Sequence, residues 1–194
     1  MSEFSIYFEL GLDHILDTKG LDHMLFIIIL CAIFYLRDWK KVLVLVTAFT
    51  IGHSITLALA TLQVIEIDNQ IIEFLIPLTI FITGITNLFY KEQALRPAKI
   101  SINYFYALFF GLIHGMGFSN YLRSLMGKDS SIVSDLLAFN LGLELGQIVI
   151  VLIFLIVNML FVDILTVKKR DWRMVVSSAG AGIALYLMIE NKFW

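Results

Sequence analysis

The residues of this chain that could perform chemistry are histidines and carboxylates set within apolar sequence. Two imidazoles directly follow an aspartate and two adjoin a glycine, while one glutamate interrupts a further apolar run. Ionisable groups are costly in hydrocarbon, so such residues in spanning segments indicate a functional site. Imidazole and carboxylate groups together also form a ligand set for nickel, cobalt or zinc. The residues are Asp13, His14, Asp22, His23, His53, His114 and Glu144.

The depth of these groups in the membrane can be estimated from the basic residues that end each apolar segment. His23, His53 and His114 each lie about 14 residues, or roughly 21 Å along a helix, from the nearest such residue. By the same measure, Glu144 lies farther from the end of its apolar segment, at roughly 28 Å. Separate helices therefore bring ligand-type groups to one layer in the outer half of the bilayer. We predict a metal site formed by Asp22, His23, His53, His114 and Glu144.

A second set of polar residues is expected around that site. Asp13 and His14 precede the first spanning segment, so they are candidate outer ligands or part of a solvated face. Carboxamides bind borderline metals poorly, so Asn140 and Gln147, like Ser54, are expected as supporting partners. A proton relay or a structural hydrogen-bond network would use the same residue types.

The composition defines the class of protein that must position these groups. The chain has 194 residues, of which 59% are hydrophobic and 15% charged, and its mean hydropathy is +0.88. Such a chain is expected to be an all-α integral membrane protein in the lipid bilayer. No basic patch indicates nucleic acid, and one cysteine, Cys31, excludes an internal disulfide. The acidic N-terminus lacks the basic region of a cleavable signal peptide.

Apolar runs predict a single transmembrane domain, residues 1–194, with six spanning helices. An N-terminal segment, 3–16, is apolar on one side and is expected to lie at the membrane interface. The spans are expected at about 20–36, 41–62, 70–90, 101–119, 135–162 and 174–190.

Basic residues predict the orientation. Most of the 14 lysines and arginines fall in the connections after the first, third and fifth predicted spans. Because positive residues favour the cytoplasmic side, both termini are expected outside the cytoplasm, with the protein in the cell (inner) membrane.

Two pairs of small residues predict close helix contacts near the site. Gly111 and Gly115 share a face of the fourth predicted span, as do Gly142 and Gly146 on the fifth. Small residues at this spacing let helix backbones approach closely. The third span carries a threonine stripe that includes Thr79, which would line a path.

Four motifs, in order along the chain, resemble those of the HupE/UreJ family, in particular its broader branch. That family is associated with hydrogenase and urease gene clusters, and its better-studied members are regarded as nickel, or nickel and cobalt, permeases. The motifs are Gly20-Leu-Asp22-His23-Met-Leu-Phe26, Gly52-His53-Ser54, Phe110-Gly-Leu-Ile-His114-Gly-Met-Gly-Phe118 and Phe139-Asn140-Leu-Gly-Leu-Glu144-Leu-Gly-Gln147.

Two functions fit these residues. The first is an uptake permease that captures a divalent transition metal from the outer side. The second is a zinc-dependent intramembrane hydrolase, in which Glu144 or Asp22 would serve as general base. The permease is the expected function, which makes the protein a transporter and not an enzyme. The residues alone do not choose among nickel, cobalt and zinc, nor do they fix the oligomeric state.

Overall fold

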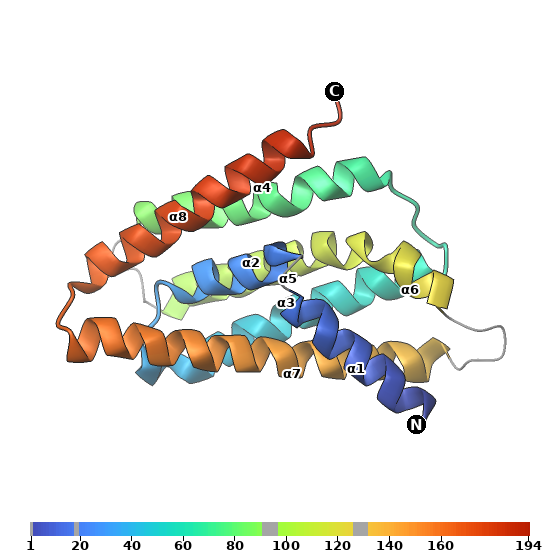
Figure 1. The fold of residues 1–194 in the computed structure, drawn as a ribbon, viewed down its shortest axis with the longest axis horizontal. Helices are drawn as coiled ribbons and strands as arrows, with labels where there is room; N and C mark the ends of the chain where they lie inside the picture. The colour runs from blue at the N-terminus through green and yellow to red at the C-terminus, as the bar shows by residue number, and fades with distance from the viewer. Residues whose placement is uncertain (1, 18–19, 91–96, 126–131) are drawn as a thin grey trace.

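The computed structural model describes residues 2–17, 20–90, 97–125 and 132–194, and this part of the chain is helical without strands. Helices cross the molecule from end to end, and short connections join them at both ends (Figure 1). The elements in chain order are α1 (Glu3–Leu16), α2 (Leu21–Cys31), η1 (Leu36–Asp38), α3 (Trp39–Thr61), α4 (Asn69–Leu88), α5 (Pro97–Gly117), α6 (Ser119–Leu125), α7 (Ile132–Met159), η3 (Leu160–Ile164) and α8 (Lys169–Glu190).

Within the described residues, four helical segments are long and apolar enough to cross a membrane, which makes this an integral membrane protein. They are Leu36–Thr61, Asn69–Leu88, Ile132–Ile164 and Lys169–Glu190. These agree with four of the predicted spans to within a few residues. A further apolar helix, α2 (Leu21–Cys31), is shorter, and α5 is apolar over its described part, Tyr104–Gly117.

The first predicted span, 20–36, differs most from the structure. α2 has 11 residues, so it is roughly 16 Å long and cannot alone cross a hydrocarbon core of about 30 Å. The chain leaves the helix after Cys31, and the backbone carbonyl of Phe34 then accepts hydrogen bonds from Asn158 and Lys169. These buried polar side chains require an acceptor, and a carbonyl released from helical bonding supplies it.

α1 compensates for the short α2. It runs from one end of the molecule to the middle, where α2 begins and continues toward the other end (Figure 1). The sequence predicts α1 as an interfacial segment, but the helix packs along α7 and buries Tyr7, Gly11 and Ile15. α1 and α2, which we call the broken crossing, together extend along the bundle as two helices that meet near its middle (Figure 1).

Glycines hold the site-bearing helices in close pairs, as the sequence predicts. A Cβ on Gly111 or Gly115 of α5 would overlap a backbone carbonyl of α3, that of Phe49 or of His53. Likewise, a Cβ on Gly142 of α7 would overlap the carbonyl of Phe8 on α1. These contacts fix α5 against α3 and α1 against α7, so they also fix the side chains that those helices carry.

Candidate metal centre

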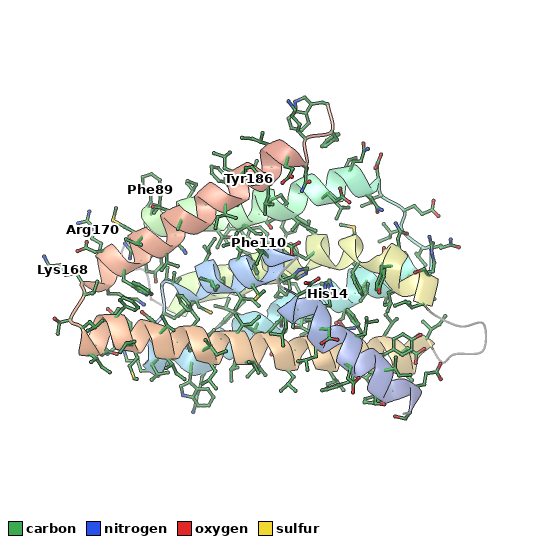
Figure 2. The ribbon with its side chains drawn as sticks, in the orientation of Figure 1. His14, Phe89, Phe110, Lys168, Arg170 and Tyr186 are labelled. Atoms are coloured by element: carbon green, nitrogen blue, oxygen red, sulfur yellow. The ribbon has the colours of Figure 1, made fainter. Side chains whose placement is uncertain are left out.

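Three histidines from different helices meet inside the bundle. His14 comes from the last turn of α1, His23 from the first turn of α2 and His53 from the C-terminal half of α3. One ligand atom of each lies within 4.8 Å of those of the other two. Figure 2 shows His14 at the end of α1 near the middle of the molecule. The broken crossing therefore contributes two of the three imidazoles.

Asp22 orients the ring of His23. Its Oδ1 lies 3.0 Å from Nδ1 of His23 and also accepts the backbone N–H of that residue at 2.8 Å. A carboxylate only accepts, so Nδ1 carries the hydrogen and the Nε2 lone pair remains free. That Nε2 is buried and has no hydrogen-bond partner. A histidine held in this way by a carboxylate is typical of metal ligands.

His114 of α5 lies beside this group, and Thr79 of α4 orients its ring. The ring centroids of His114 and His23 are 5.1 Å apart. The hydroxyl of Thr79 donates to the carbonyl of Ile76 at 2.7 Å, so it accepts from Nε2–H of His114 at 3.1 Å. The lone pair of His114 is consequently on Nδ1, which is buried without a partner.

Several ring nitrogens of this cluster have no hydrogen-bond partner. Nε2 of His14 has none, and His53, which is fully buried, has only the side chain of Asn140 within reach of its ring. Buried polar groups are almost always hydrogen-bonded, so several orphaned imidazole nitrogens in one place require an explanation. A divalent metal holds nitrogen ligands about 2.0–2.1 Å away, or about 3.3 Å from one another in a tetrahedral shell. Rotations of the three rings would be needed to bring their ligand atoms from the observed spacing, within 4.8 Å, to this shorter distance.

Aromatic rings enclose the histidines. Phe118 lies 4.0 Å from the ring of His14, centroid to centroid, and stacks on Phe139. On the other side, Phe26 and Phe49 lie 5.4 and 5.1 Å from the ring of His114. Such an apolar wall excludes water, which strengthens electrostatic interactions inside it.

A cavity of about 680 Å³ reaches the cluster from one side. It is lined by His14, by Phe118 and Tyr121, and by the carboxyl-bearing residues Asp13 and Asp17. His14 is therefore the member of the cluster that this cavity contacts. Acidic residues along a narrow approach raise the local concentration of cations.

The remaining candidate residues lie around this group in different ways. Glu144 is half-buried, and its carboxylate accepts a hydrogen bond from Thr47 of α3 at 2.7 Å. Ser54 and Asn140 donate to carbonyls of their own helices, those of Thr50 and Leu136. Gln147 contacts the hydroxyl of Thr50 at 2.7 Å. The three-histidine group found in the described chain includes none of these residues.

The sequence predicts His14 only as an outer ligand, but the structure brings it into the three-histidine group. A signal for this was present, because the tetrapeptide Gly-Leu-Asp-His occurs at 11–14 and again at 20–23. Thr79 was expected to line a path and instead contacts His114. The enclosing ring of Phe118 was not singled out, because an aromatic residue near a helix end is common in membrane proteins.

The fold and the site define an integral membrane protein with a buried histidine group suited to a transition-metal ion. The chain matches the family model described as HupE / UreJ protein over residues 1–191, and it belongs to this family. It matches no curated protein and no solved structure. The resemblance noted from the four motifs is therefore confirmed for the whole length of the chain.

Proposed function

We propose that this protein is an uptake permease for a divalent transition metal of the nickel and cobalt type. The observation that carries the proposal is the group of His14, His23 and His53, each of which has a buried ring nitrogen without a hydrogen-bond partner. The association of the HupE/UreJ family with nickel and cobalt uptake supports it. Nickel, cobalt and zinc all accept imidazole ligands, so this ligand set does not select one of them.

The proposed direction of transport, uptake, rests on the end of the molecule toward which the cavity at His14 lies. Lys168 and Arg170 lie at the end of the molecule where α7 joins α8 (Figure 2), and positive residues favour the cytoplasm. The acidic cavity is lined in part by Tyr121 of α6, which lies toward the opposite end (Figure 1). A cation that reaches His14 through this cavity would also meet Asp13 and Asp17, which line it.

A zinc-dependent intramembrane hydrolase is the competing function, because three imidazoles and a water also make a catalytic zinc site. The acidic lining of the cavity at His14 favours a cation over a lipid-borne substrate as the molecule that enters. The same carboxylates would disfavour binding of an anionic or apolar substrate.

Metal loading followed by transport tests the proposal. Purified full-length protein should bind about one divalent metal per chain, and His23→Ala and His53→Ala should remove it. In proteoliposomes, wild-type protein should pass nickel or cobalt, and the two variants should not. Folded wild-type protein that binds no transition metal under any loading condition would refute the proposal. Metal-dependent cleavage of a membrane peptide without transport would favour the hydrolase.

A further inference from the structure

We propose that Glu144 and Thr47 form a second cation site, through which the metal passes after it leaves the histidines. This inference rests on the proposed uptake function. The oxygen atoms of the two side chains lie 2.7 Å apart, between α3 and α7. Thr47 precedes His53 by six residues on α3, so the pair lies roughly 9 Å from His53 toward the end that carries Lys168 and Arg170.

A groove of about 290 Å³ lies beside this pair, along α3 and α7. It is lined by the polar residues Thr47, Thr50, Ser54, Asn140 and Glu144 together with the apolar residues Ile51, Ile55, Leu137 and Leu141. Ser54 directly follows His53 in the sequence, and Glu144 lies one turn beyond Asn140 on α7. Polar side chains therefore occur at intervals between the level of His53 and the carboxylate.

The polar groups between α3 and α7 are not fully satisfied by one another. Gln147 is fully buried and contacts the hydroxyl of Thr50. The hydroxyl of Thr50 has one hydrogen but two possible acceptors, which are the side-chain oxygen of Gln147 and the carbonyl of Val46 at 3.1 Å. Either orientation of the Gln147 amide leaves one of its polar atoms buried without a partner. An orphaned amide group beside a path suits transient contacts with a hydrated cation.

Charge gives a second reason for a cation at Glu144. A carboxylate at membrane depth is costly unless it pairs with a cation or lines a water-filled cavity. Among the described residues, Glu144 makes no salt bridge, and Thr47 supplies a hydrogen bond but no charge. A passing divalent ion would provide the missing positive charge.

The two sites are expected to differ in metal affinity, and the difference has the sign that transport requires. Carboxylate and hydroxyl oxygens hold nickel or cobalt less tightly than a cluster of imidazoles does. Conduction needs binding strong enough for entry and weak enough for release, and a weaker site further along the path serves the second requirement. Glu144 would then be dispensable for tight metal binding and necessary for transport.

The test measures cobalt(II) binding and transport by the same full-length variants. Equilibrium dialysis gives the tight binding, and quenching of a trapped dye gives uptake into proteoliposomes down a cobalt gradient, without a pH gradient. The variants are Glu144→Gln and Thr47→Val. Glu190→Gln is the matched control, since it makes the same carboxyl-to-amide change at the exposed end of α8.

We expect Glu144→Gln to keep about one tight cobalt per chain and to lose at least about tenfold in uptake rate, with a smaller loss in Thr47→Val. Glu190→Gln should behave as wild type. Loss of the tight cobalt in Glu144→Gln would overturn the inference, because Glu144 would then bind the same ion as the histidines. Uptake by Glu144→Gln at the wild-type rate would also overturn it. The same holds if the variant is defective only when the assay is repeated with a pH gradient. Wild-type protein that neither binds nor passes cobalt would refute the uptake function itself.

Discussion

Replacing Gly142 by alanine tests whether the packing of α1 on α7 builds the histidine group. A Cβ at Gly142 would overlap the backbone carbonyl oxygen of Phe8, and a Cβ at Gly11 would overlap that of Phe139. Backbone atoms cannot rotate out of the way as a side chain does, so the two helices must separate. Because α1 carries His14, this separation withdraws its ring from those of His23 and His53.

The size of the effect follows from the packing cost. Inserting a methyl group into a close-packed contact costs about 1–3 kcal/mol. If tight binding requires docked α1, this cost appears in the metal affinity, at a factor of ten for each 1.4 kcal/mol or so. The dissociation constant of nickel should therefore rise by about 5- to 150-fold in Gly142→Ala.

Chelator competition with purified, folded protein measures this constant. Gly182→Ala on α8 is the matched control, because no heavy atom lies within 4 Å of a Cβ built there. Gly11→Ala should resemble Gly142→Ala, and the double variant should fall short of the sum of the two effects, since either change already relieves the same contact. Equal nickel affinity in Gly142→Ala and Gly182→Ala would refute the reasoning.

Two further predictions concern the site and its orientation. Asp22→Asn should weaken metal binding by about 10- to 100-fold without abolishing it, because Asp22 orients His23; complete loss in a metal titration would make Asp22 a direct ligand. Cysteine at Gln63 should react with an impermeant thiol reagent applied outside intact cells, whereas cysteine at Arg170 should not; the opposite pattern would reverse the proposed orientation.

The sequence was sufficient to predict the level at which the histidines meet. Counting residues from basic ends places His23, His53 and His114 in one layer, because rise along a helix is nearly constant. The same count cannot fix the rotation of a helix about its own axis. Glu144 lies on a predicted helix, yet its carboxylate contacts Thr47 and lies outside the three-histidine group. Rotation depends on tertiary packing, which a one-dimensional count does not contain.

The early end of α2 was harder to predict, because its causes are distant in sequence. Residues 20–36 form a nearly continuous apolar run, which predicts one spanning helix. The helix ends early where Asn158 and Lys169, more than a hundred residues away, bond to the carbonyl of Phe34. Gly11 was the local clue for α1, since a glycine on its apolar face indicates a close helix neighbour and not a lipid surface.

The broken crossing brings two helix ends to the three-histidine group. The last carbonyl groups of a helix lack intrahelical partners and carry the negative end of the helix dipole, whereas the first N–H groups carry its positive end. α1 ends at Leu16, within one turn of His14, and His23 lies in the first turn of α2. The two helix dipoles therefore oppose each other at this group. The break acts through position, because it makes the place of the His14 ring depend on the packing of α1 on α7.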